Sequence, residues 1–334
     1  MKSSGLFVIT SVYHILLSIL LIEERKLKNN ILVIVEITPD IESLKDSLKQ
    51  SPWFNDVILL IGRKKQKKLA GKLCYTFNRK HIVKLIDKTN LKLKSLPNQN
   101  NSFDVYICSP DSAKNYFIYK YKDHNIFMIE DGLKTYVSQS PSFFKQLYAK
   151  LINRPLVNGY DRRIQKVFAT SPKELPPLLK SKSEKLDWKN TFKQLNKVKL
   201  NTLATAFSPN KQLVTNSLFP EGKTKSIILT QTLNEDGVIE EESEKINIYT
   251  SFVKQAKTDL IYIKPHPRER TDYNTLFAEH KHIIVLPKLF PAELLNMYPN
   301  LKFKMAFTAF STAIDHLEHV EEKISLGHAK FKRK

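Results

Sequence analysis

The sequence contains few cysteines and few glycines, and each shortage excludes a class of protein. Its two cysteines, Cys74 and Cys108, cannot form a disulfide framework or a four-ligand structural zinc site, and their apolar neighbours predict burial. With 8 glycines, 42% hydrophobic and 26% charged residues among 334, collagen-like, low-complexity and wholly disordered chains are excluded as well. The length suffices for two domains with their own cores. We therefore expect a globular protein of a reducing, cytosolic environment.

Acidic residues are also scarce, since 33 Asp and Glu stand against 54 Lys and Arg, a formal net charge of +21. Basic residues gather in a run at positions 63–68 and in the tail at 330–334. A soluble, lysine-rich surface is one interpretation of this excess. The other is electrostatic attraction to a phosphate-bearing ligand, to an anionic glycan or to the inner leaflet of a membrane.

No long, uninterrupted hydrophobic run is present. The most apolar stretch, residues 5–22, is interrupted by Thr10, Ser11, Tyr13 and His14 and ends at the charged residues 23–26. No small-residue cleavage site follows it, so it is not typical of a signal peptide or a membrane span. We predict a buried strand at residues 5–10 and a helix from Tyr13 that packs on the sheet.

Apolar, β-branched runs of strand length alternate with helical stretches, which is typical of buried parallel strands in α/β sheets. The first set lies at residues 5–10, 31–37, 57–61, 104–109 and 125–130, and the second at residues 226–230, 259–263, 282–286 and 304–308. Between the sets, residues 171–224 are rich in proline, lysine and small polar residues. The pattern therefore predicts two doubly wound α/β domains, residues 1–175 and 223–334, with a junction at 176–222.

The strand predicted at 125–130 runs into Glu130, Asp131 and Gly132. Ligand sites of doubly wound sheets lie beyond the carboxyl ends of strands, and Gly132 permits a sharp turn that directs one carboxylate into the crevice. Such a carboxylate can accept a proton from an attacking hydroxyl. The alternative is that the two acids cap the next helix or begin a turn.

The strand predicted at 259–263 continues as KPHPRER, in which Pro265 and Pro267 flank His266. The prolines restrict the backbone and thereby fix the direction of the imidazole. A histidine held among the basic residues at 264, 268 and 270 suits contact with a phosphate, to which it can donate a hydrogen bond or a proton. A structural turn with an incidental exposed histidine is the alternative.

Three further strand-end positions carry polar candidates. Glu293 lies in the first turn of a helix predicted to begin at Pro291, where a carboxylate can accept hydrogen bonds from ribose hydroxyls. Ser311 and Thr312 follow the strand predicted at 304–308, and hydroxyls with free N–H groups at a helix start form a phosphate cradle. Gln231 directly follows the run 226–230 and is a further candidate for lining the site. Dipole and capping roles are the ordinary alternatives for Glu293 and Ser311.

The order of these motifs resembles that of the bacterial sialyltransferases of glycosyltransferase family 52 and of the related polysialyltransferases of family 38. Those families carry an acidic-acidic-Gly motif, an HP motif and a Ser-Ser or Ser-Thr motif in this order, and a start similar to ITSVYHILLS. The resemblance extends from residue 5 to about residue 318. It implies the GT-B fold, in which two Rossmann-type domains face each other across a cleft. The N-terminal domain would carry the general base and the acceptor side, and the C-terminal domain would bind the CMP donor.

Carried over residue by residue, the resemblance implies that Asp131 is the general base and that His266 contacts the CMP phosphate and assists its departure. Ser311 and Thr312 match the phosphate-binding hydroxyls, although Thr312 departs from the more usual Ser, and Glu293 matches a glutamate near the ribose. The remaining candidates are Pro267 and Gln231 on the donor side and Thr10, Ser11, His14, Glu130 and Gly132 on the acceptor side.

The implied activity is that of an inverting sialyltransferase, which moves sialic acid from CMP-sialic acid to a bacterial lipooligosaccharide or capsule. No metal and no other cofactor is expected, because the sequence has no DxD-like triplet and the acidic clusters at 235–236 and 240–242 are typical of solvated faces. Two alternatives remain, a polysialyltransferase and a GT-B enzyme that uses another nucleotide sugar. The linkage formed and the number of residues added are not determined by these motifs.

A nucleic-acid-binding protein is the rival hypothesis, because the net charge of +21 is typical of that class. The aromatic residues, however, lie within apolar runs, and no recognition motif is present, so we expect no nucleic-acid partner. A cytoplasmic enzyme with peripheral contact to the anionic inner membrane is the expected setting. A homodimer is a further hypothesis.

Overall fold

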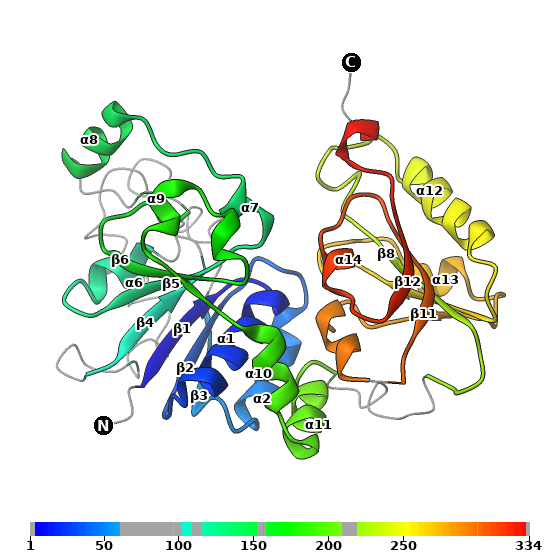
Figure 1. The fold of residues 1–334 in the computed structure, drawn as a ribbon, viewed down its shortest axis with the longest axis horizontal. Helices are drawn as coiled ribbons and strands as arrows, with labels where there is room; N and C mark the ends of the chain where they lie inside the picture. Colours follow the sequence, from blue (N-terminus) through cyan, green and yellow to red (C-terminus); the bar gives the residue numbers. More distant parts are fainter. Residues whose placement is uncertain are drawn as a thin grey trace. The chain divides into compact units, whose positions relative to one another are not determined.

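The computed structural model describes residues 4–60, 96, 102–108, 115–151, 156, 158–208, 219–298 and 300–331. The chain divides into two compact units, Met1–Asn196 and Lys197–Lys334, drawn as ribbons in Figure 1. The division falls within the junction predicted at 176–222. Cys74, the basic run at 63–68 and the last three tail residues lie outside the described residues, whereas Cys108 is a buried free cysteine whose thiol donates to Val8 O.

The N-terminal unit is built on a seven-stranded parallel sheet with the order β3-β2-β1-β4-β5-β6-β7. Its strands are β1 (Gly5–Ile9), β2 (Ile31–Val35), β3 (Asp56–Leu60), β4 (Asp104–Ile107), β5 (Ile126–Ile129), β6 (Ile164–Ala169) and β7 (Ser183–Lys185). The first five confirm the predicted runs. The strands β6 and β7 were not predicted, because β7 is polar and β6 buries its last three residues only after two exposed positions.

Helix α1 (Val12–Arg25) follows β1 directly and confirms the predicted helix. Ser11 caps its first turn by accepting the His14 N–H at 3.3 Å, and Lys26 closes it in the left-handed conformation. The other helices of this unit are η1 (Ile41–Leu44), α2 (Lys45–Lys49), α6 (Asn115–Lys120), α7 (Leu133–Tyr136), α8 (Phe143–Leu151), η3 (Pro172–Glu174), α9 (Pro177–Lys180) and α10 (Trp188–Gln194). Among the residues that the structure describes, no helix is both long and apolar enough to cross a bilayer.

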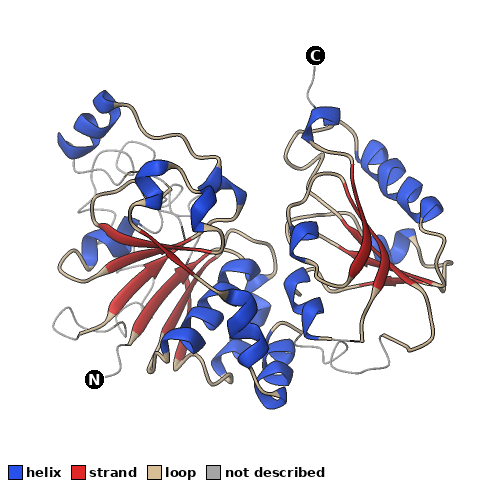
Figure 2. Ribbon diagram, viewed as in Figure 1, coloured by secondary structure: helices blue, strands red, loops and turns tan. Residues whose placement is uncertain are grey.

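The C-terminal unit repeats the arrangement in a five-stranded parallel sheet with the order β10-β9-β8-β11-β12. Its strands are β8 (Lys225–Leu229), β9 (Leu260–Lys264), β10 (Ile283–Val285), β11 (Phe303–Thr308) and β12 (Val320–Ser325). Its helices are α11 (Lys197–Ala206), α12 (Glu242–Gln255), α13 (Tyr273–Leu276), η5 (Ala292–Met297), α14 (Ala313–His316) and η6 (His328–Phe331). Figure 2 shows the strands of each unit gathered in a sheet with helices around it.

Each unit is a doubly wound α/β fold, so the predicted fold class is confirmed. In both sheets the first strand lies in the interior, with the second and third strands on one side and the fourth and fifth on the other. Strand order reverses beside that first strand, β1 in one unit and β8 in the other, and ligand sites of such sheets lie at this switch point. The carboxyl ends of β1 and β5, and of β8, β9 and β11, therefore position the candidate residues.

Candidate active site

Asp131 and Gly132 follow β5 and form the turn that the sequence predicts. Gly132 has φ +62° and ψ −146°, a conformation that residues with a Cβ rarely adopt. A Cβ at this position would meet no atom within 4 Å, so the backbone conformation, and not crowding, requires glycine. The Asp131 N–H donates to Thr135 Oγ1 at 2.7 Å, and its side chain remains 25% exposed. The turn thus leaves the carboxylate of Asp131 accessible.

Glu130 differs from its neighbour, because its residue is 1% exposed and its carboxylate is occupied by side chains and backbone of the same unit. Its oxygens accept hydrogen bonds from Tyr13 Oη at 2.6 Å and from the Thr170 N–H at 2.7 Å, and also from Tyr136 Oη. These partners come from α1, from the segment after β6 and from α7. Glu130 therefore ties three elements together around the end of β5, and sequence reasoning missed all three partners.

His14 lies beside Asp131, with 3.0 Å between His14 Nε2 and Asp131 Oδ1. Its other nitrogen, Nδ1, is 3.2 Å from Thr10 Oγ1, so both nitrogens are engaged and the ring is fixed. Burial on its own lowers the pKa of His14, but the sulfur of Cys108 and the carboxylate of Asp131 outweigh it and raise this pKa from 6.5 to about 9. At neutral pH the ring is therefore a cation held against Asp131.

The predicted acceptor-side residues thus gather at one edge of the N-terminal sheet. Thr10 and Ser11 follow β1, His14 lies in the first turn of α1, and Asp131 follows β5. Ser11 caps α1, since its Oγ accepts the His14 N–H, and this role was not predicted. The arrangement presents one accessible carboxylate with a cationic neighbour.

In the C-terminal unit His266 follows β9 and is half-buried. The Arg268 N–H donates to His266 Nδ1 at 3.1 Å, which assigns the ring proton to Nε2. No residue in the described part of the chain accepts a hydrogen bond from that Nε2–H. Burial, Arg268 and Lys264 lower the pKa of His266 to about 4, so the ring is neutral at pH 7. His266 is therefore a preoriented hydrogen-bond donor.

Glu269 holds the turn around His266, and sequence reasoning missed it. It is 2% exposed and accepts the His266 N–H at 2.7 Å, Tyr273 Oη at 2.8 Å and the hydroxyl of Thr230. Burial raises the pKa of Glu269, and buried Lys245 offsets its charge with Nζ 3.7 Å from Oε1. The motif KPHPRER does contain this glutamate, but spacing alone does not tell which of its charged residues faces inward.

Gln231 joins the ends of β8 and β11. Its Oε1 accepts the Phe310 N–H at 2.7 Å, and its own N–H donates to Tyr249 Oη at 2.7 Å. Ser311 follows Phe310 in the chain, and its N–H donates to Thr308 Oγ1 at 3.1 Å. The loop that carries Ser311 is thereby anchored to the central strands of the sheet, and the neighbouring Thr230 contacts the His266 N–H at 3.2 Å. The strand end of β8 thus connects the two predicted phosphate-binding segments.

The other predicted donor-side residues are placed as follows. Thr312 is exposed at the start of α14, and its hydroxyl makes no capping bond there. Pro267 is half-buried beside His266. Glu293 in η5 is 7% exposed, and its Oε1 lies 3.5 Å from His316 Nδ1. Glu293 thus has a partner inside its own unit, and this contact was not predicted.

The sequence matches the family model of glycosyltransferase family 52 over residues 57–330, which is most of the chain. The chain belongs to glycosyltransferase family 52. The predicted family is therefore confirmed. A relative from Haemophilus influenzae, described as an uncharacterized protein, is 31% identical over 213 residues, which are 63% of this chain and 64% of the relative.

Solved structures of lower similarity also match this family-52 chain. The UDP-GlcNAc 2-epimerase of Neisseria meningitidis bound to UDP-GlcNAc is 16% identical, with a TM-score of 0.49, over 93% of this chain and 78% of that chain. The S. aureus MnaA-UDP structure is 12% identical, with a TM-score of 0.48, over 94% and 76%. Similarity of this degree does not bear on the ligands of the present chain.

The acidic clusters of the family-52 chain correct the predicted solvated face at one position. The side chain of Glu235 is 11% exposed, because its carboxylate binds buried Lys245 with Nζ 2.8 Å from Oε1. Asp236 pairs with Arg268 at 2.7 Å but is exposed, as are residues 240–242, in agreement with the prediction. Both carboxylates belong to the loop after β8 and brace the His266 turn. Within the described ranges no three His, Cys, Asp or Glu side chains form a group suited to a metal ion. The expected metal independence stays a prediction.

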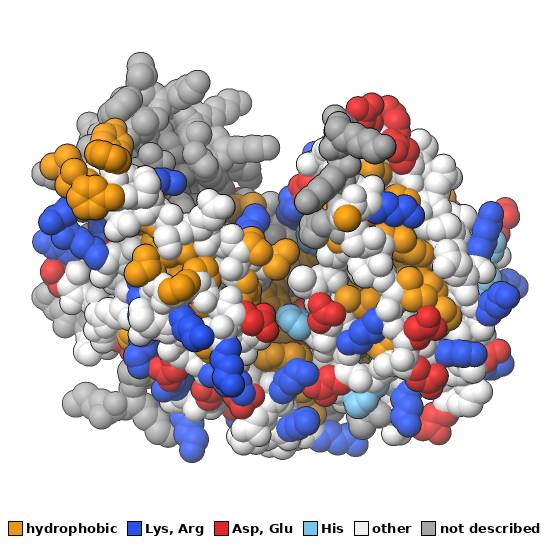
Figure 3. Space-filling view, turned by 45° about the horizontal axis from the view of Figure 1, so that its top comes forward, with side chains coloured by type: hydrophobic (Ala, Val, Ile, Leu, Met, Phe, Trp, Pro, Cys, Tyr) orange, Lys and Arg blue, Asp and Glu red, His pale blue; other side chains and the backbone are white. Residues whose placement is uncertain are grey.

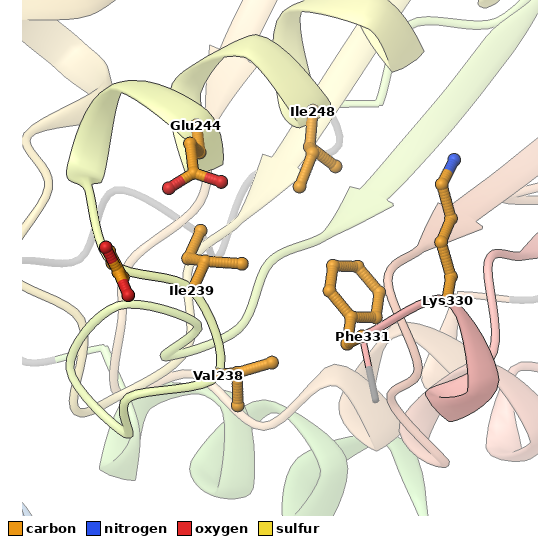
Figure 4. A pocket seen from close by; sticks show the side chains of 7 residues that line it. Val238, Ile239, Glu244, Ile248, Lys330 and Phe331 are labelled. Carbon is orange, nitrogen blue, oxygen red and sulfur yellow. The ribbon is translucent and has the colours of Figure 1, made fainter. Parts of the chain in front are cut away.

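One pocket of about 430 Å³ lies beside α12 and η6, apart from the predicted site residues. Figure 4 shows Val238, Ile239, Ile248 and Phe331 around it. The ring of Phe331 packs edge-on against Phe310, with 5.3 Å between the ring centroids. The pocket is thus connected to the loop of Phe310 through Phe331, and none of its lining residues was predicted to belong to a site.

Proposed function

We propose that this family-52 glycosyltransferase is an inverting sialyltransferase that uses CMP-sialic acid as donor and a hydroxyl of a bacterial surface glycan as acceptor. The observation that carries the proposal is the His266 turn, whose neutral ring offers an Nε2–H that no described residue uses. A group of this kind suits a phosphate that gains charge as it departs. The motif order adds the expectation of a cytidylate leaving group.

The donor chemistry explains why hydrogen-bond donors suffice. The anomeric carbon of sialic acid is tertiary and bears a carboxylate, so its transfer state resembles an oxocarbenium ion with the leaving group well separated. The charge that grows on the single phosphate of CMP is offset by His266 Nε2–H, by the hydroxyls of Ser311 and Thr312 and by the amide of Gln231. Glu293 accepts from the ribose, and no metal is required.

The acceptor chemistry uses the carboxylate of Asp131. The acceptor oxygen forms its bond to the anomeric carbon as the bond to the phosphate oxygen breaks, and the acceptor proton passes to Asp131. The electron pair of the broken bond leaves with CMP, and this single displacement inverts the anomeric centre. His14, with Nε2 3.0 Å from Asp131 Oδ1, orients the carboxylate between turnovers. The base thus belongs to the N-terminal unit and the phosphate-binding groups to the C-terminal unit.

The proposed acceptor is a galactose- or sialic-acid-terminated lipooligosaccharide or capsule chain at the cytoplasmic face of the inner membrane. A polysialyltransferase would use the same residues and would elongate sialylated acceptors. The purified protein should therefore be incubated with CMP-sialic acid and either lactose or a sialylated oligosaccharide, with and without EDTA, and in parallel with UDP-sugars. Consumption of UDP-sugars alone would refute the donor assignment, and loss of activity in EDTA would refute metal independence.

Two substitutions test the residue roles. Asp131→Ala should lower turnover by about 10²- to 10⁴-fold while CMP still raises the melting temperature, because this residue acts on the acceptor. His266→Ala should reduce both the turnover and the CMP-induced rise. Asp46→Ala and His280→Ala, exposed residues of the same two units, are the matched controls and should change neither. Near-full turnover of Asp131→Ala would show that the base is another group.

A further inference from the structure

Helix α8 exposes an unusual amount of apolar surface. Five of its side chains are large, hydrophobic and exposed, namely Phe143 at 72%, Phe144 at 79%, Leu147 at 43%, Tyr148 at 56% and Leu151 at 75%. Its one buried residue is Ala149 at 7%. Exposed apolar residues that occur singly need no explanation, but a helix that is exposed along a whole apolar face marks an interaction surface.

The exposed apolar residues share one side of α8. Because successive residues of an α-helix are turned by about 100°, the five fall within an arc of about 140°, and Ala149 lies opposite the middle of this arc. Lys145 and Lys150 lie beyond the two edges of the arc, one at each side. The helix therefore rests on its unit by its small residue and turns a hydrophobic face, bordered by lysines, to the solvent.

The charge around α8 has one sign. Residues 132–160 contain no Asp or Glu, but they contain Lys134, Lys145, Lys150 and Arg154. In Figure 3 hydrophobic side chains gather next to Lys and Arg side chains at the end of the N-terminal unit that carries α8. The apolar face of α8, bordered by lysines on a stretch without acidic residues, is complementary to a surface with an apolar interior and anionic groups at its boundary with water.

We propose that α8 is the element by which this protein docks on an anionic lipid surface. Phe143, Phe144 and Leu151 enter the boundary between headgroups and acyl chains, and Lys145 and Lys150 extend to the lipid phosphates. A second copy of the chain fits less well, because stable protein interfaces bury about 20–30 residues a side and α8 has nine. The proposal is independent of the donor sugar. It assigns the expected membrane contact to α8, which belongs to the same unit as Asp131.

The test measures co-sedimentation of the full chain with vesicles of phosphatidylcholine alone and with vesicles that also contain phosphatidylglycerol. Wild type should bind the anionic vesicles, and Phe144→Glu should lower the partition coefficient by at least tenfold, by loss of apolar insertion and by repulsion. Lys145→Gln and Lys150→Gln should each lower it by about fivefold. The matched control is Val198→Glu, which changes an apolar residue of 73% exposure on α11 and should bind as wild type does.

A fluorescence readout separates docking from misfolding. Phe144→Trp should shift its emission to shorter wavelength when anionic vesicles are added, as expected for an indole that leaves water. Vesicle binding of Phe144→Glu at the wild-type level would overturn the proposal. It would also be overturned if wild type bound no vesicles but formed a dimer in solution that the Phe144→Glu substitution dissociates. Turnover of a soluble acceptor without vesicles should be equal in wild type and Phe144→Glu, so a failure of the sialyltransferase proposal is recognised separately.

Discussion

Replacement of His14 by glutamine tests whether a buried cation sits beside the proposed base. In the folded protein the pKa of His14 is raised from 6.5 to about 9, because Cys108 and Asp131 outweigh the opposing effect of burial. The folded state then binds a proton more tightly than the unfolded state does. The resulting stabilisation is fully present below pH 6.5 and is lost as the pH rises through about 9.

The magnitude follows from the size of the shift. Between pH 6.5 and pH 9 the free energy of unfolding should fall by about 1.4 kcal/mol per pH unit at most, and in total by about 3 kcal/mol. His14→Gln retains an N–H that can donate to Asp131 but cannot gain a proton. The variant should therefore be less stable than wild type at pH 6 by up to this amount, and the two should converge above pH 9.

The assay is urea unfolding followed by tryptophan fluorescence at several pH values. The sequence has 2 tryptophans, Trp53 and Trp188, and both lie in the N-terminal unit, so the signal reports the unit that contains His14. Asp131→Asn removes one of the two groups that favour the charged ring and should reduce the slope, while substitution of the exposed residue Asp46 on α2, Asp46→Asn, should leave the slope unchanged. Equal slopes for wild type and His14→Gln would refute the assignment of a charged His14.

Two further predictions concern the turns at the strand ends. Glu269→Gln should destabilise the C-terminal unit by about 2 kcal/mol and abolish the CMP-induced rise in melting temperature, since Glu269 accepts the His266 N–H. The control is Glu279→Gln at an exposed residue, and an unchanged response of Glu269→Gln to CMP would show that the carboxylate is dispensable. Gly132→Ala should lower the free energy of unfolding by about 1–3 kcal/mol and lower turnover, because φ +62° is strained for alanine. Gly237→Ala, at φ +70° in the other unit, should lose stability without losing turnover, and equal turnover of the two variants would refute this role of Gly132.

The fold could be predicted because hydrophobic patterning is a local property of the chain. Nine apolar runs correspond to nine strands of the two parallel sheets, since strands buried on both faces need continuous apolar segments. The strands without such runs were missed, and two of them, β7 and β12, lie at sheet edges and contain no buried residue. The strand ends were predictable too, because parallel strands present their carboxyl ends at one edge.

The roles within each strand end could not be predicted, because they depend on residues far away in the sequence. Glu130 and Asp131 are adjacent and chemically alike, yet only Glu130 is buried, since Tyr13, 117 positions away, and Thr170, 40 positions away, occupy its oxygens. Asp131 is left accessible to His14 and to solvent.

The same contrast holds in the C-terminal unit. The pattern of prolines around His266 indicated a fixed imidazole, but only the contact with the Arg268 N–H assigns the proton to Nε2, and only packing selects Glu269 as the residue that braces the turn. By itself the sequence determined nine of the strands, the motif order and the family. Burial and hydrogen-bond partners decided which carboxylate is accessible and which histidine is charged, since these properties arise only when segments distant in sequence pack against one another.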